Sequence, residues 1–392
     1  MTEIPALSGA LEGGRGTGIA GAISAAVLSG GALVHASWHG EIPAPRARPL
    51  RRDDLFDVAS LTKVLATATL AAMLVEEGAL ELDAPAARWL PAFEREGKER
   101  VTVRHLLAHA SGLAWWRPYH ELAAADPVAG LAFLPTGRRP PPGALREAFA
   151  RGREIVREAV LAERLEAEPG TRAVYGDPAY LALGWIVEAA GREPIARLAE
   201  RRLVEPLGLA STFFLDGLDP PGSAERAVGR SFAPTRRSAP RGGEVVQGAV
   251  DDDNAWAVGG AAGHAGLFST ATDVAAIGQA WLEAVNGRGS VVPVAAAREF
   301  ARPDATPASG RALGWDTPSR GATSLGTRLG RGRKGAIGHL GFTGTSLWID
   351  LDREVVVALL TNHCHPDGPD KPRMLEFRRR FHDVVAEALG IG

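Results

Sequence analysis

The chain has 392 residues, a formal net charge of −2 at neutral pH and 45% hydrophobic residues. This length and apolar content suffice for one large domain, or two to three small ones, with a full-sized core. Acidic and basic residues are interspersed, so the sequence predicts no broad basic surface for nucleic acid or an anionic membrane. The single thiol, Cys364, excludes an intramolecular disulfide framework.

The start of the chain shows no targeting signal. The segment from Met1 to Gly21 lacks a basic region followed by a compact apolar run, and no later segment is apolar for 18 residues. We therefore expect a cytoplasmic protein that is not embedded in a membrane, or a periplasmic one if a leader has been removed.

The first elements are predicted to be strands and the middle of the chain to be helical. Gly18 to His39 has the alternation of two short strands that turn at Ser29-Gly30-Gly31. An apolar run from Ser60 to Glu77 favours a long helix. Further helical patterns cover residues 103–110, 144–168, 178–190 and 194–203. Their interruptions at 135–143 and 234–243 are rich in Pro, Gly and Arg, and predict exposed loops with solvated arginines.

The last third of the chain returns to strands. Thr270 to Asp273 has the sequence of a capping box opening a helix that runs to about Val285. Residues 344–350 and 354–361 are rich in strand formers, and a helix is expected from about 373 to 389. If the terminal strands pair, the chain forms an α+β fold: an antiparallel sheet flanked by helices, with a helical insertion.

Ser60 and Lys63 form the most informative motif. Residues three apart lie on the same face of a helix, so the hydroxyl and the amine can touch. Only four of the 44 basic residues are lysine. Because an arginine cannot lose its proton, a lysine here indicates an amine that activates the serine as a nucleophile. The alternative is a lysine whose stem packs on the helix surface while its amine reaches solvent.

Two further clusters suit the same site. Tyr175 and Asp177 lie in a turn before a helix, where a phenolic oxygen near an ammonium can shuttle a proton. His339 to Gly344 open a strand, and the glycines there let a substrate approach backbone amides that can bind an oxyanion. Each cluster alone is weak evidence, since a tyrosine in a turn or a histidine on a strand is more often structural.

The order and spacing of these motifs resemble those of the penicillin-recognising serine hydrolases, in the branch of class C β-lactamases, DD-carboxypeptidases and β-lactamase-fold esterases. That family has Ser-x-x-Lys on a helix, a Tyr-x-Asn type motif in a helical insertion, and Lys or His followed by x-Gly on a strand. The matching segments here are 56–63, 103–113, 175–177, 263–270, 339–341 and 344–350. The resemblance covers about residues 15 to 390.

The resemblance implies a single β-lactamase/transpeptidase-like domain over residues 1–392, with a sheet part at 1–82 and 250–392 and a helical insertion with loops at 83–249. It also implies an acyl-enzyme on Ser60, with Lys63 and Tyr175 moving the proton. Backbone amides of Ser60 and Phe342 would form the oxyanion hole, and Asp177, His339, Gly341, Phe342 and Thr343 would contact the substrate or its oxyanion. It implies no cofactor and no metal.

Three positions depart from the family pattern and decide the expected substrate. Asp177 replaces the usual asparagine, and an ionised carboxylate there would favour the ammonium form of Lys63. His339 replaces the lysine of the β-lactamases. Leu340 replaces a threonine whose hydroxyl holds the substrate carboxylate. Carboxylate recognition should therefore be weaker, unless Thr343 or an arginine takes over that role. We therefore expect a carboxylesterase-like hydrolase.

Other activities remain possible for this chain, and other residues remain candidates for a functional site. The chain could be a D-Ala-D-Ala carboxypeptidase or β-lactamase acting on an amide or lactam, or a sensor that is acylated without turnover. The sequence favours structural roles for His363-Cys364-His365 and His264, and a solvated loop at 251–254. Trp115-Trp116 fits an apolar wall for an acyl chain as well as it fits core packing.

Overall fold

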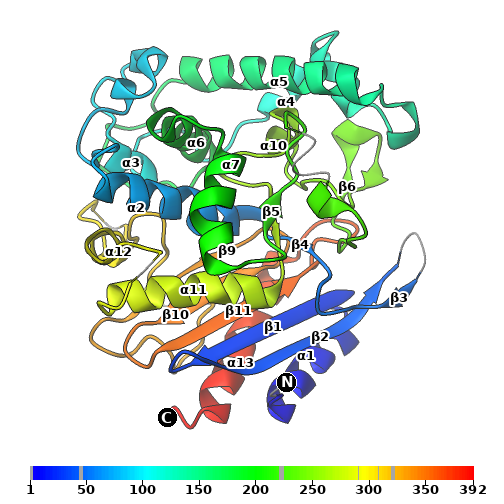
Figure 1. Cartoon of the computed structure of the whole chain (residues 1–392), viewed down its shortest axis with the longest axis vertical. Coiled ribbons are helices and arrows are strands. Elements are labelled where there is room, and N and C mark those ends of the chain that lie inside the picture. The colour runs from blue at the N-terminus through cyan, green and yellow to red at the C-terminus, as the bar shows by residue number, and fades with distance from the viewer. Residues whose placement is uncertain (1–2, 44–46, 220–224, 290, 308, 319–322) are drawn as a thin grey trace.

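A six-stranded antiparallel sheet joins the two ends of the chain in the computed structural model, which describes residues 3–43, 47–219, 225–289, 291–307, 309–318 and 323–392 (Figure 1). The strand order is β3-β2-β1-β11-β10-β9. The strands are β1 (Ala22–Ser29), β2 (Ala32–Ile42), β3 (Arg48–Pro49), β9 (Ala336–Leu340), β10 (Ser346–Asp350) and β11 (Val355–Thr361). The predicted hairpin and the pairing of N- and C-terminal strands are confirmed, with Ile23 opposite Thr361 and Ser29 opposite Val355.

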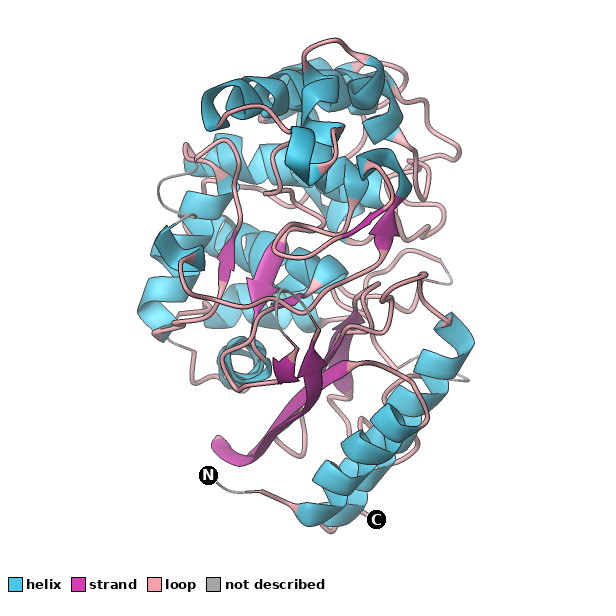
Figure 2. Ribbon diagram, turned by 90° about the vertical axis from the view of Figure 1, so that its right-hand side faces the viewer, coloured by secondary structure: helices cyan, strands magenta, loops and turns pink. Residues whose placement is uncertain are grey.

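Both faces of the sheet are buried, which explains why its central strands β1 and β11 are mostly apolar on both faces. On one face, alternate residues of β1 and β11 pack against α1 (Pro5–Gly16) and α13 (Lys371–Ala388). On the other face, the remaining residues pack against α11 (Ala271–Val285) (Figures 1 and 2). The hydrophobic core on this face is continuous with that of the helical part. Thr270 caps α11 by accepting a hydrogen bond from the Asp273 amide, as the capping-box sequence predicts.

The middle of the chain is mostly helical, and Figure 1 shows these helices stacked on the α11 side of the sheet. The helices of this part include α2 (Thr69–Glu76), α3 (Val103–Leu107), α4 (Tyr119–Ala125), α5 (Pro142–Ala162), α6 (Asp177–Gly191), α7 (Ile195–Ala199), α10 (Asp253–Ala257) and α12 (Val294–Ala301). Short helical segments are η1 (Ala59–Leu61), η2 (Lys63–Ala68), η3 (Ala86–Arg88), η4 (Pro91–Glu94), η5 (Ala129–Phe133), η6 (Thr136–Arg138), η7 (Glu200–Val204), α8 (Glu205–Leu207) and η8 (Ala239–Arg241). A three-stranded sheet has the order β4-β8-β5, with β4 (Phe56–Asp57), β8 (Leu267–Ser269) and β5 (Phe213–Phe214). A two-stranded sheet pairs β6 (Arg237–Ser238) with β7 (Glu244–Val245).

The predicted helix from Ser60 to Glu77 is not a regular α-helix. It consists of the 3₁₀ turn η1, the π-helical segment η2 and then α2. Tertiary hydrogen bonds hold this part, since Thr67 donates to the Gly263 carbonyl and Thr62 accepts from the Leu267 amide. The segment Ala59–Glu76 is long and apolar enough to span a membrane, with a mean hydropathy of 1.3, but 83% of it is buried inside this fold. It forms the core of the protein.

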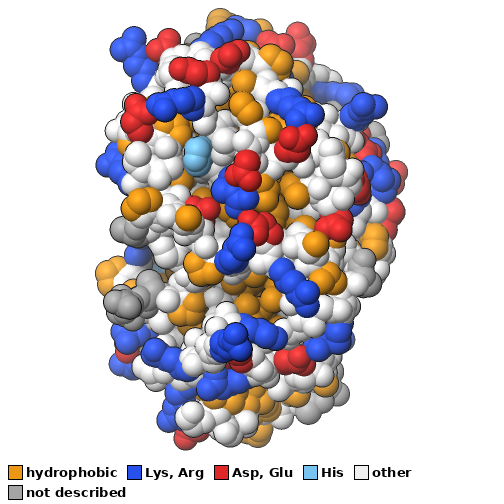
Figure 3. All heavy atoms as spheres, turned by 90° about the vertical axis from the view of Figure 1, so that its left-hand side faces the viewer, with side chains coloured by type: hydrophobic (Ala, Val, Ile, Leu, Met, Phe, Trp, Pro, Cys, Tyr) orange, Lys and Arg blue, Asp and Glu red, His pale blue; other side chains and the backbone are white. Residues whose placement is uncertain are grey.

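The predicted exposed loop at residues 234–243 is a second correction. Arg241 is 2% exposed and donates to the Asp253 carboxylate and to the carbonyls of Val250 and Asp251. Arg236 is half-buried and pairs with Asp251 and Asp253. These arginines are charge partners inside the protein, whereas on the face shown in Figure 3 basic and acidic side chains are interspersed at the surface.

Candidate active site

Ser60 follows a strained residue at the junction of strand and helix. Ala59 has a positive φ of 49°, which is uncommon for a residue with a side chain. The Asp57 carboxylate supports this turn by accepting a hydrogen bond of 2.8 Å from the Ala59 amide. Ser60 is thereby placed in the first turn of η1, where backbone amides lack helical partners.

Lys63 contacts Ser60 as the spacing predicts. Its Nζ lies 2.9 Å from the Ser60 hydroxyl oxygen, 2.8 Å from Asp177 Oδ1 and 3.4 Å from the His264 carbonyl oxygen. Burial opposes the charge on this fully buried amine, but Asp177 and Tyr175 outweigh it and raise the pKa of Lys63. The resting site therefore holds an ammonium ion paired with a carboxylate.

Tyr175 lies beside this ion pair. Lys63 Nζ is 5.0 Å from the centre of its ring, and the phenol interacts with both Ser60 and Lys63 through hydrogen bonding. Burial nevertheless raises the pKa of Tyr175, so the phenol is neutral at rest. His109 accepts a hydrogen bond from the Gly176 amide on its ring and one from the Val174 amide on its carbonyl, which holds the backbone on both sides of Tyr175.

His339 faces the same site from β9. Burial, with the charges of Lys63 and Arg311 nearby, lowers the pKa of His339 well below its usual value, so the ring is neutral. Its Nδ1 lies 2.9 Å from the Leu340 carbonyl oxygen and donates to it. Among the described residues Nε2 has no partner, so it is a buried, unsatisfied acceptor of a residue that lines the cavity.

The turn between β9 and β10 packs directly on the serine turn. Gly341 is required there, because a Cβ atom would lie 2.0 Å from Thr345 Oγ1 and 2.6 Å from the Val58 carbonyl oxygen. Phe342 is 42% exposed and lines the cavity. In the described part of the chain, neither the Ser60 amide nor the Phe342 amide donates a hydrogen bond, so both are available to an oxyanion.

Thr343 is the predicted substrate contact that the structure places elsewhere. Its side chain is fully buried, and its hydroxyl donates to the Asp57 carbonyl oxygen at 2.8 Å. It does not line the cavity. Its hydroxyl therefore ties the β9–β10 turn to the serine turn and cannot also bind a substrate carboxylate.

These residues open into a cavity of about 1070 Å³. Apolar side chains of Trp115, Trp116, Leu340 and Phe342 line it, and Trp115 is 61% exposed, so the tryptophan pair forms a wall and is not core packing. Cationic side chains also line it, notably Arg311, whose guanidinium lies 4.9 Å from the Tyr175 ring centre. The volume is ample for a small ester or a peptide terminus.

The acidic run at 251–254 lies along the cavity with Asp251, Asp253 and Asn254 buried, which corrects the expected solvated loop. Asp251 and Asp253 pair with Arg236, and the Asp251 amide donates to the Asp57 carboxylate. Burial, and then the neighbouring Asp251, raises the pKa of Asp57 to about 7. The segment is part of the scaffold behind Ser60.

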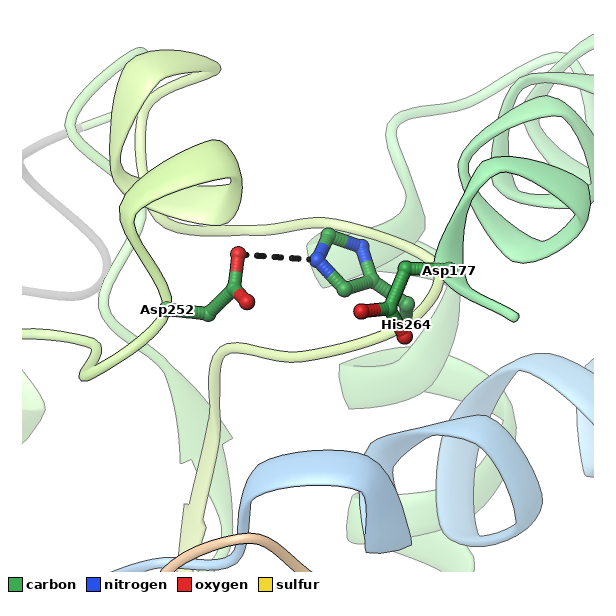
Figure 4. Close-up of side chains that lie close together, drawn as sticks. All are labelled: Asp177, Asp252 and His264. Atoms are coloured by element: carbon green, nitrogen blue, oxygen red, sulfur yellow. Dashed lines mark hydrogen bonds and ion pairs between the residues drawn. The ribbon is translucent and has the colours of Figure 1, made fainter. Parts of the chain in front are cut away.

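Asp177, Asp252 and His264 bring one ligand atom each within 4.8 Å of one another, which is a possible metal geometry (Figure 4). The Asp252 carboxylate, however, already contacts His264 Nε2 at 2.9 Å. The Lys63 ammonium occupies the cation position beside Asp177 and the His264 carbonyl. The group therefore fits an ammonium-centred network better than a metal centre, and His264 holds its loop as expected.

Four residues near the site were not identified from the sequence as site residues: Asp57, His109, Arg311 and Arg378. The motif from His109 to Gly112 was noted only as part of a family-like segment. The two arginines carry no local signal in a chain with 44 basic residues. His363 lies in the turn after β11 and has a structural role there, since its ring contacts the carbonyls of Ile19 and Asp370.

Comparison with known proteins identifies the class. The β-lactamase family profile matches residues 9–377, so the chain belongs to the β-lactamase family. A relative described as a putative D-alanyl-D-alanine carboxypeptidase, from Salmonella schwarzengrund (strain CVM19633), is 29% identical over 343 residues, which are 81% of this chain and 72% of the relative. The chain is therefore a β-lactamase-related serine hydrolase, and the family acts on small ester, amide or lactam substrates.

Solved structures confirm the fold. EstCE1, a hydrolase with promiscuous acyltransferase activity, superposes with a TM-score of 0.69 at 18% identity, covering 96% of this chain and 98% of that protein. The octameric penicillin-binding protein homologue from Pyrococcus abyssi has a TM-score of 0.68 at 21% identity, with 98% and 77% of the two chains covered. The α+β fold expected from the sequence is thereby confirmed.

Proposed function

We propose that this chain is a carboxylesterase-like hydrolase that cleaves small esters through an acyl-enzyme on Ser60. In this mechanism Lys63 or Tyr175, both protonated at rest, first releases a proton to solvent. The Ser60 oxygen then attacks the ester carbonyl, the deprotonated group accepts the serine proton, and this proton passes to the leaving alcohol as the ester C–O bond breaks. The amides of Ser60 and Phe342 hold the oxyanion, and water then releases the acyl group.

The apolar lining next to Ser60 carries the preference for esters. Leu340 lies in the cavity where family members with carboxylate substrates have threonine, and Phe342, Trp115 and Trp116 continue the apolar surface. These side chains favour an acyl chain by burying its apolar surface, and Leu340 and Phe342, next to Ser60, have no side-chain donor for a carboxylate. The fold neighbour EstCE1, a hydrolase with promiscuous acyltransferase activity, agrees with this proposal.

A D-amino-acid carboxypeptidase is the second candidate, because of Arg311. Its guanidinium lines the cavity beside Tyr175 and could bind a terminal carboxylate, although it is already paired with Asp316. The relative described as a putative D-alanyl-D-alanine carboxypeptidase supports the same candidate.

The test is a comparison of kcat/KM for a chromogenic short-chain ester, a chromogenic cephalosporin and a peptide ending in D-Ala-D-Ala. We expect the ester to be the best substrate and Ser60→Ala to abolish its turnover. A preference for the peptide or the cephalosporin would refute the ester proposal. Stable labelling of Ser60 without turnover of any of the three would identify an acylated sensor instead.

A further inference from the structure

Arg378, on α13, is a buried cation that none of the predicted catalytic steps uses. Its side chain is 6% exposed and lines the cavity, and among the residues that the structure describes it has no ion-pair partner. Its Nε also lacks a hydrogen-bond partner within the described chain. Burying a guanidinium without a counter-ion is costly, and burial alone lowers the pKa of Arg378 to about 9. A leucine or methionine would fill the same space without that cost.

The partners of Arg378 are two carbonyl groups at the ends of the oxyanion turn. Its Nη2 donates to the Gly341 carbonyl oxygen at 3.1 Å and to the Thr345 carbonyl oxygen at 2.7 Å. The Gly341 amide donates to the same Thr345 carbonyl at 2.8 Å, so the guanidinium closes the turn that presents the Phe342 amide. Both bonds come from the one nitrogen Nη2, whose two N–H groups are fixed in the guanidinium plane, whereas the N–H groups of an ammonium rotate freely.

The same turn is linked to the serine turn by two threonines. Thr343 donates to the Asp57 carbonyl and Thr345 donates to the Val58 carbonyl at 2.9 Å. A displacement of the β9–β10 turn would therefore change the separation between the Phe342 amide and Ser60. The contacts of Arg378 with the Gly341 and Thr345 carbonyls restrain this separation further.

We propose that Arg378 is a positioning residue for the oxyanion hole: by clamping the carbonyls of Gly341 and Thr345, it keeps the Phe342 amide aligned with Ser60. This role rests on the proposed catalytic function of Ser60. It differs from direct substrate binding, in which Arg378 would pair with a carboxylate of the substrate.

The test measures the rate at which a neutral fluorophosphonate labels Ser60, because this reaction needs the oxyanion hole whatever the natural substrate is. Arg378→Met keeps the apolar stem and removes the clamp, and should slow labelling by about 100-fold, the scale of a misplaced reacting group. Arg378→Lys keeps a charge and an ammonium whose donors rotate freely on a different stem, so the clamp is weakened and labelling should be intermediate. The matched control is Arg380→Met on the same helix, since Arg380 is exposed and pairs with Glu376; its labelling rate should equal that of the wild type.

Ester kinetics separate positioning from substrate binding. With a neutral ester, Arg378→Met should lower kcat while KM stays nearly constant, since the loss occurs in the transition state. The proposal would be overturned if Arg378→Met kept the labelling rate and the kcat of the wild type for neutral probes and was impaired only with carboxylate-bearing substrates. If circular dichroism shows that Arg378→Met does not fold, Arg378→Lys is tested in its place. A labelling rate in Arg378→Lys equal to that of the wild type would then overturn the proposal. A wild type whose Ser60 is not labelled would instead refute the proposed function.

Discussion

Asp177→Asn is the change that most directly tests the protonation state of the site. The carboxylate lies 2.8 Å from Lys63 Nζ and raises the pKa of Lys63, and it also raises the pKa of Tyr175. Both groups are consequently protonated at rest, and the rate of acylation should rise with pH until one of them gives up its proton. Removing the carboxylate lowers both pKa values, so this acid limb should move to lower pH.

The size of the shift follows from the contact. An opposite charge at this distance changes a pKa by about 1 to 3 units. Asp177 is 18% exposed, and partial solvent screening places the expected shift nearer to about 1 unit than to 3. One unit corresponds to about 1.4 kcal/mol and to about a tenfold gain in kcat/KM at a fixed pH on the acid limb.

The assay is the pH profile of kcat/KM for a neutral chromogenic ester in wild type, Asp177→Asn and Glu121→Gln. Glu121 is an exposed carboxylate that lines the same cavity without contacting Lys63, so Glu121→Gln removes the same charge without affecting the ion pair. Its profile should coincide with that of the wild type. An acid limb that stays in place in Asp177→Asn would show that neither Lys63 nor Tyr175 controls the rate, and would refute this account of proton transfer.

Three further predictions concern the same site. Ser60→Ala should abolish turnover and fluorophosphonate labelling while changing the free energy of unfolding by less than about 1 kcal/mol; persistent labelling would place the nucleophile elsewhere. Lys63→Arg cannot deprotonate and should slow acylation by at least about 100-fold, as should Tyr175→Phe. Near wild-type acylation in Lys63→Arg would leave Tyr175 as the base. Leu340→Thr adds a hydroxyl to the cavity and should improve acylation by a carboxylate-bearing β-lactam about tenfold relative to a neutral ester, from about 1.5 to 3 kcal/mol for a hydrogen bond to a charged group. An unchanged ratio would mean that another residue, such as Arg311, reads the carboxylate.

The sequence was sufficient wherever the determining contacts are local. The hairpin of β1 and β2, the apolar run of β11 and the cap of α11 follow from patterns within a few residues. Ser60 and Lys63 are three apart, so their contact depends on one helical turn and survives the change from α-helix to 3₁₀ and π-helix. The order of the three motifs was sufficient to indicate the family.

Only the tertiary structure decided which charges are buried and with what partner. Asp177 meets Lys63 across 114 positions of sequence, and Arg241 meets Asp253 inside the protein although its segment has the composition of an exposed loop. Arg378 stands among 44 basic residues, and its importance depends on packing against a turn that lies 33 to 37 positions away. A charged residue in a local stretch of sequence predicts an exposed side chain, because burying its charge is costly. The carbonyls and carboxylates that offset this cost come from distant segments, so they are known only once the fold has brought those segments together.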